Sequence, residues 1–160
     1  TVAIEVGLII ACILFMKRVM ETTEISVIKD EIDPNKESDL EVHEEHLVVP
    51  DGVEVYEING PYFFGIATKF EEIMSELGDR PKVRIVRMRK VPFIDSTGIH
   101  NLTNLCEMSK KENIRIVLSG VNSKVHQVLK KAGFYELLGE ENICPNINVA
   151  LDKAKAIIEK

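Results

Sequence analysis

Residues 95–98, DSTG in one-letter code, have the types and the spacing that can support chemistry. A β-branched run at 82–89, typical of a strand, precedes them, and an apolar helical pattern begins directly after them at Ile99. The first turn of a helix has N–H groups without intrahelical partners and carries the positive end of the helix dipole. A hydroxyl at this position can cap the helix, contact an anion or accept a phosphate. We call residues 95–98 the elbow and take it as the first candidate site.

Two roles are open for the hydroxyls of Ser96 and Thr97 in the elbow. As a helix N-cap, either hydroxyl would stabilise the fold by about 0.5–2 kcal/mol, and this is the main role that we expect. The elbow would also serve as a partner-contact or phosphorylation surface, with Asp95 and Gly98 as further contact residues. A phosphate there would lie at a helix N-terminus and add about two negative charges.

A second candidate site consists of four cations in and after the strand that precedes the elbow: Arg84, Arg87, Arg89 and Lys90. The main expectation is a strand whose polar face and exit are solvated. The alternative is a small patch that binds an anion, a nucleotide or an acidic partner. These cations lie close together in the sequence, although the chain as a whole has a net charge of −6.

Composition and spacing exclude several classes of function. The net charge of −6 argues against a nucleic-acid binder. Cys12, Cys106 and Cys144 are widely spaced, so neither a disulfide framework nor a zinc site is expected. The sequence HEEH at 43–46 lacks the H-E-x-x-H spacing of a zinc helix, and a solvated linker is expected there. We find no phosphate-binding GxxxxGK loop and no catalytic constellation around the elbow, so no enzyme activity, cofactor or metal is expected.

The elements that position the elbow alternate along residues 50–160. We expect strands at 53–58, 82–88 and 114–118, and helices at 62–77, 97–111, 122–132 and from 147 to the end. This alternation predicts an α/β fold with a mainly parallel sheet of four or five strands. Functional loops lie beyond the carboxyl ends of such strands, which is where the elbow falls. The aromatic residues in FFG at 63–65 are assigned to the core rather than to a binding site.

The first 49 residues differ in character from the rest. Residues 1–16 are almost continuously apolar, and Lys17 and Arg18 follow directly. Cations after the apolar run are typical of a last transmembrane helix that leaves on the cytoplasmic side, whereas a signal peptide carries them before it. A buried helix of a soluble domain is the weaker alternative. We therefore assign 1–20 to the end of a transmembrane helix and 21–49 to an acidic connector with a short strand at 25–28. Because the sequence begins with Thr1, we expect it to be part of a longer protein.

Two segments together resemble a known family. The sequence RMRKVPFIDSTG, a helix and then IRIVLSGVNSKVHQVLKKAGF resembles the STAS domain, the fold shared with bacterial anti-sigma-factor antagonists. The apolar run ending in LFMKRV, joined by an acidic connector, is similar to the SulP family of sulfate-permease-type anion transporters. The resemblance implies a STAS domain at 50–160 that acts as a regulatory and interaction domain. It places residues 21–160 in the cytoplasm, below the inner (plasma) membrane.

Site residues are carried over from the family one by one. Ser96 matches the serine that a partner kinase phosphorylates in the antagonists, Thr97 the second hydroxyl, and Gly98 the glycine that permits a tight turn. The implied partners are the transmembrane domain of the same transporter, a second copy of the chain or an acidic cytoplasmic protein. A soluble antagonist that acts by partner switching is the alternative function, and the apolar run at 1–16 weighs against it.

Overall fold

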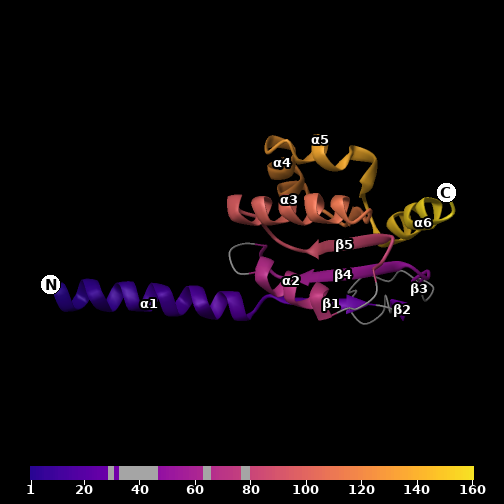
Figure 1. The fold of residues 1–160 in the computed structure, drawn as a ribbon. Coiled ribbons are helices and arrows are strands. Elements are labelled where there is room, and N and C mark those ends of the chain that lie inside the picture. Colours follow the sequence, from indigo (N-terminus) through magenta and orange to yellow (C-terminus); the bar gives the residue numbers. More distant parts are fainter. Residues whose placement is uncertain (29–30, 33–46, 63–65, 77–79) are drawn as a thin grey trace, which may run out of the picture.

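The computed structural model describes residues 1–28, 31–32, 47–62, 66–76 and 80–160 (Figure 1). The interpretations of FFG at 63–65 and of HEEH at 43–46 therefore lie outside the described residues.

A five-stranded sheet in the order β1-β4-β5-β6-β7 forms the centre of the domain. Its strands are β1 Glu24–Ile28, β4 Val53–Asn59, β5 Val83–Lys90, β6 Arg115–Ser119 and β7 Ile143–Cys144. β1 pairs antiparallel with β4 at the edge, and the other three pairings are parallel. The short strands β2 Glu31–Ile32 and β3 Leu47–Val48 pair with each other in a second sheet. The predicted mainly parallel sheet is confirmed, and its edge strand lies within the segment that was expected to be a connector.

Helices cover both faces of the main sheet. The described helices are α1 Val2–Glu21, α2 Ile66–Glu76, α3 Ser96–Lys111, α4 Ser123–Lys131, α5 Phe134–Leu138, the 3-10 helix η2 Glu140–Asn142, and α6 Ile147–Ile158. Helices α2 to α5 pack against one face and α6 against the other, which gives two buried apolar clusters. Successive strand residues face opposite sides of a sheet, so Tyr56 and Ile58 lie in the first cluster and Val53 and Val55 in the second.

The described part of α2 begins later than predicted. Tyr62 was expected to be the first residue of this helix, but it forms an isolated parallel bridge with Ile94. The Tyr62 N–H donates to the Phe93 carbonyl oxygen (3.1 Å), and the Asp95 N–H donates to the Tyr62 carbonyl oxygen (3.4 Å). These bonds hold Tyr62 in an extended conformation beside the loop that leads to the elbow.

Helix α1 extends away from the sheet, and none of its residues is buried (Figure 1). Ile4, for example, is 75% exposed. Its base is attached to the domain through Thr23, which is fully buried. The Thr23 hydroxyl donates to the Pro61 carbonyl oxygen (3.5 Å), and the Lys69 ammonium donates to the Thr23 carbonyl oxygen (3.2 Å). Across the described ranges, no helix combines the length and the apolarity that crossing a membrane requires.

Candidate recognition site

The elbow lies where β5 passes into α3, at the carboxyl edge of the parallel sheet. Asp95 is the N-cap of α3, and its carboxylate Oδ1 accepts a hydrogen bond from the Gly98 N–H (2.7 Å). The prediction that Ser96 or Thr97 caps the helix is therefore wrong. Asp95 has the extended backbone of an N-cap residue (φ −99°, ψ 179°), and its negative charge suits the positive end of the helix dipole.

Because Asp95 provides the cap, the Ser96 hydroxyl is not used for it. Ser96 is the first residue of α3 and is exposed, and its hydroxyl makes no hydrogen bond within the described part of the chain. His100, one turn further along, is paired with Asn104 (His100 Nε2 to Asn104 Nδ2, 3.3 Å) on the exposed side of the helix. The elbow thus presents an accessible hydroxyl next to a carboxylate, an arrangement suited to recognition or modification.

Gly98 is required for close packing. A Cβ built on Gly98 would clash with the Tyr62 carbonyl oxygen, and it would lie 2.8 Å from Ile94 Cγ1 and 2.9 Å from Tyr62 Cδ1. Its φ does not lie in the left-handed region, so the expected tight turn is not the reason for a glycine here. The glycine instead allows the first turn of α3 to lie against the backbone of Tyr62.

Two residues around the elbow were missed by the sequence interpretation. The Asn122 side chain caps α4 by accepting from the Val125 N–H (2.9 Å), and its amide donates to the Val91 carbonyl oxygen (2.6 Å). This clamp holds the N-terminus of α4 to the loop before the elbow. Phe93 in the same loop is 52% exposed. An asparagine before a helical pattern was the available signal for the first residue, whereas the exposure of Phe93 depends on packing.

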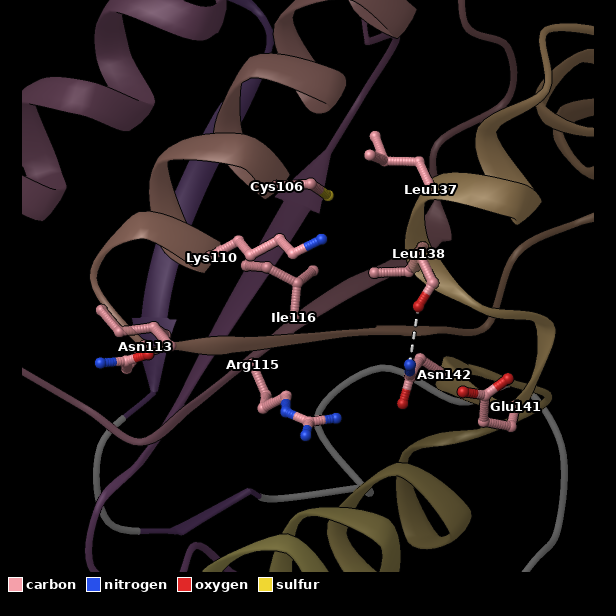
Figure 2. A pocket seen from close by; sticks show the side chains of 10 residues that line it. Cys106, Lys110, Asn113, Arg115, Ile116, Leu137, Leu138, Glu141 and Asn142 are labelled. Atoms are coloured by element: carbon pink, nitrogen blue, oxygen red, sulfur yellow. Dashed lines mark hydrogen bonds between the residues drawn. The ribbon is translucent and has the colours of Figure 1, made fainter.

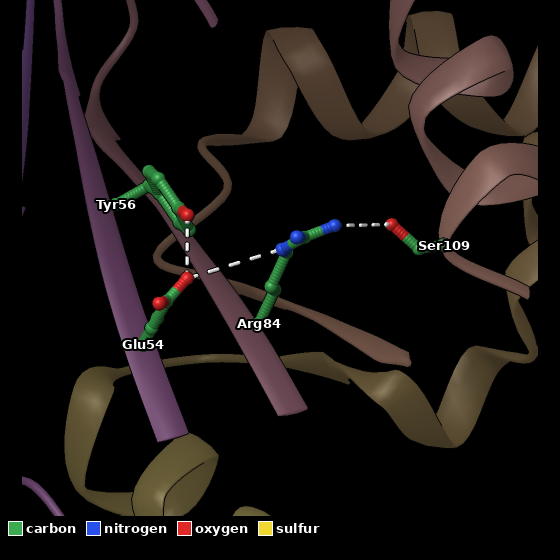
Figure 3. Close-up of polar contacts among 4 residues, drawn as sticks. All are labelled: Glu54, Tyr56, Arg84 and Ser109. Carbon is green, nitrogen blue, oxygen red and sulfur yellow. Dashed lines mark hydrogen bonds and ion pairs between the residues drawn. The ribbon is translucent and has the colours of Figure 1, made fainter. Parts of the chain in front are cut away.

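The prediction that the arginines of this strand are solvated is wrong for Arg84 and Arg87. These residues are only 7% and 5% exposed. Figure 3 shows the network around Arg84 on the α3 side of the sheet. Arg84 Nη1 donates to Ser109 Oγ (3.1 Å), and Arg84 Nε lies 4.0 Å from Glu54 Oε2. The Tyr56 hydroxyl donates to the same carboxylate oxygen (2.6 Å). Arg84 therefore belongs to a buried polar network.

A second carboxylate of β4 pairs with the other two arginines. Arg87 Nη1 lies 3.6 Å from Glu57 Oε2, and Arg89 Nε lies 3.4 Å from Glu57 Oε1. Arg84 and Arg87 project from opposite faces of β5, so the four cations do not form one cluster. The sequence contained a signal for this arrangement. Glutamates three residues apart in β4 stand opposite arginines three residues apart in β5, in the register Glu54 to Arg84 and Glu57 to Arg87.

We expect the domain to lose stability in alkaline solution. Burial raises the pKa of Tyr56 and Tyr62 above their ordinary value of 10.0 and that of the Cys106 thiol from 9.0 to about 12. These groups stay protonated in the folded state after the unfolded chain has begun to lose the same protons. The stabilising contribution of each group is thus complete below its unfolded pKa, 9.0 for Cys106 and 10.0 for the two tyrosines. Above that value it declines by up to about 1.4 kcal/mol per pH unit for each group. Urea unfolding between pH 8 and 11 measures this slope, and a constant free energy of unfolding over that range would contradict it.

Comparison with known protein families assigns the fold. The STAS domain model matches residues 46–150. The crystal structure of a sulfate transporter family protein from Wolinella succinogenes is 45% identical, covers 71% of this chain and 93% of its own, and has a TM-score of 0.68. The SulP transporter STAS domain from Vibrio cholerae is 39% identical, with coverages of 70% and 88% and a TM-score of 0.63. The fold is thus that of a STAS domain, and the chain belongs to the STAS domains of the SulP transporter family.

Longer relatives put this domain in context. The chain is 26% identical over 146 residues to a putative sulfate transporter, YvdB, of Bacillus subtilis, which covers 88% of the chain but only 25% of that relative. The chain therefore spans about a quarter of the length of this transporter. Murine Slc26a9, an anion transporter, shares the fold over 97% of the chain at 20% identity and a TM-score of 0.67. A putative anti-sigma factor antagonist from Thermotoga maritima also shares the fold, at 17% identity and a TM-score of 0.57.

Proposed function

We propose that this chain is the cytoplasmic regulatory domain of a secondary anion transporter, with α1 as the end of the last membrane helix. The observation that carries the proposal is the exposed apolar helix, which is attached at its base to a SulP-type STAS domain. Its partner is then the transmembrane domain of the same transporter. Two solved relatives above 30% identity are named for sulfate or SulP transport, so sulfate is the first anion to test. The role is a non-enzymatic one.

Within this proposal, the elbow is the regulatory surface. Ser96 offers an exposed hydroxyl at the start of α3, and the exposed Phe93 lies in the loop just before it. A phosphate on Ser96 would be attracted by the helix N-terminus and repelled by the Asp95 carboxylate that already occupies the Gly98 N–H. Such a group would change the charge of this surface while the fold stays intact. The candidate partners that would detect this change of charge are a second copy of the chain and an acidic cytoplasmic protein.

A short series of contacts connects the elbow to the base of α1. The first turn of α3 packs against Tyr62 at Gly98, and Tyr62 follows Pro61, whose carbonyl oxygen accepts from the buried Thr23. Thr23 follows Thr22, the C-cap residue of α1. A partner that shifts the elbow would therefore act on the segment that leads into the membrane helix, and this supports a role in regulating transport.

The test is sulfate uptake by the whole transporter carrying Ser96→Asp. We expect uptake to change at least about fivefold, the lower end of a usual regulatory coupling. Ser96→Ala reports the loss of the hydroxyl alone. Ser123→Asp is the matched control, because Ser123 is the first residue of α4, at the same position relative to its cap. Unchanged uptake with Ser96→Asp, in a transporter that still reaches the membrane, would argue against a regulatory elbow.

The alternative function is a soluble antagonist that exchanges partners under control of Ser96 phosphorylation. The shared fold and the elbow favour this alternative. The exposed apolar helix α1 weighs against it, because a soluble antagonist has no use for such a helix. Binding of a purified kinase and an anti-sigma factor in the absence of membrane, with no sulfate uptake by the whole protein, would favour this alternative.

A further inference from the structure

A cavity of about 440 Å³ lies at the end of α3 that is remote from the elbow (Figure 2). It opens between the last turns of α3, the start of β6 and the α5–η2 segment. Neither the family assignment nor the proposed role of the elbow gives this cavity a function. Its volume falls within the range of small-molecule sites in proteins, about 300–1,000 Å³.

A few apolar side chains form the floor of the cavity, whereas polar and charged side chains form most of the rest of its lining. Ile116 and Cys106 are 5% and 7% exposed, and Leu138 lies beside them (Figure 2). The Asn142 side-chain amide donates to the Leu138 carbonyl oxygen (2.7 Å), which fixes the wall formed by α5 and η2. This floor would favour an apolar group and would remove the hydration shell of an inorganic ion without replacing it.

Two exposed cations stand at the rim. Lys110 extends from α3 toward Leu138, and the Arg115 guanidinium lies on the side that faces Asn142, whereas Glu141 stands at the far rim (Figure 2). The charges around the cavity therefore sum to about one positive charge, in a chain whose net charge is −6. Because α3 ends here, the helix presents carbonyl oxygens rather than N–H groups, and its dipole disfavours a highly charged anion.

We propose that this cavity binds a small organic monoanion, a carboxylate attached to an apolar body. The apolar body would occupy the floor formed by Ile116 and Leu138, and the carboxylate would pair with Lys110 and Arg115. Sulfate fits poorly because of the apolar floor. A nucleotide fits poorly because its phosphates meet the C-terminal end of α3 and Glu141, and none of the described lining residues is an aromatic ring on which a base would stack.

The test is a titration of the 160-residue chain with hexanoate, followed by NMR of the methyl groups of Ile116 and Leu138. For a ligand of this size we expect a Kd of about 1 mM. Hexanol, sulfate and ATP are titrated in parallel, and each should bind at least about fivefold more weakly than hexanoate. Hexanol lacks the carboxylate that pairs with the cations, and sulfate and ATP lack the apolar body that contacts the floor. No methyl shift with hexanoate, or equal binding of any of the three comparison ligands, would overturn the proposal.

Variants of the rim test the carboxylate contact. Lys110→Gln and Arg115→Gln should each weaken hexanoate binding by about five- to tenfold, because each removes one charge-assisted hydrogen bond. Lys111→Gln is the matched control, because Lys111 is exposed in the same helical turn but does not line the cavity. All three positions are exposed, so the fold should be retained, as amide NMR spectra will show. Equal weakening by Lys111→Gln, or no weakening by either rim variant, would overturn the proposal.

Discussion

Replacement of Arg84 by methionine is expected to lower the free energy of unfolding by about 3–5 kcal/mol, because it removes one partner of a buried ion pair. The side chains of Arg84 and Glu54 are 8% and 10% exposed. Without the guanidinium, the Glu54 carboxylate stays buried with the Tyr56 hydroxyl as its hydrogen-bond donor. Methionine fills a similar volume, so the loss reports charge and hydrogen bonding rather than a cavity. Urea unfolding at pH 7 measures it.

The double variant Glu54→Gln/Arg84→Met is the control for this prediction. It removes the buried charge, and the glutamine carbonyl can still accept from Tyr56. Since Arg84 Nε has no hydrogen-bond partner among the described atoms, the native network is not fully satisfied. The double variant should therefore recover at least about 2 kcal/mol of the loss. Arg115→Met, an exposed position on the neighbouring strand, should change stability by less than about 0.5 kcal/mol. Equal losses in the single and double variants would contradict this account.

Replacement of Gly98 by alanine is expected to cost about 3 kcal/mol, the upper part of the range for overpacking in a core. The added methyl group would meet the Tyr62 backbone oxygen as well as the side chains of Ile94 and Tyr62. A backbone atom in a bonded bridge cannot move aside as the end of a flexible side chain can. We therefore expect α3 to shift away from Tyr62, which would also disturb the Asp95 cap.

Gly7→Ala is the matched control, because a Cβ at Gly7 would have no neighbour within 4 Å. This change should leave urea unfolding of the domain unaltered. In the whole transporter, Gly98→Ala should reduce both folded protein and sulfate uptake, whereas Ser96→Asp should alter uptake alone. A Gly98→Ala domain as stable as the wild type would show that α3 has room to move at the elbow.

Much of the fold followed from local patterns in the sequence. The alternation of strand and helix periods predicted the mainly parallel sheet, and the strand–DSTG–helix order placed the elbow at its carboxyl edge, where the structure has it. The apolar run before Lys17 predicted the end of a transmembrane helix; α1 is a helix that extends away from the sheet, and its place in a membrane stays a prediction. These features depend on residues that are neighbours in the chain, so the sequence was sufficient for them.

Other features were decided only by contacts between distant residues. The sequence could not show that Arg84 and Arg87 are buried, because that depends on the parallel register that sets them opposite Glu54 and Glu57. The sequence analysis assigned the cap to Ser96 or Thr97 rather than to Asp95, because the cap depends on the loop geometry that the backbone bond to Tyr62 gives Asp95. The cavity at the end of α3 likewise exists only once α5 and η2 fold against β6. Local periodicity specifies the elements, whereas strand register and helix docking determine which side chains meet.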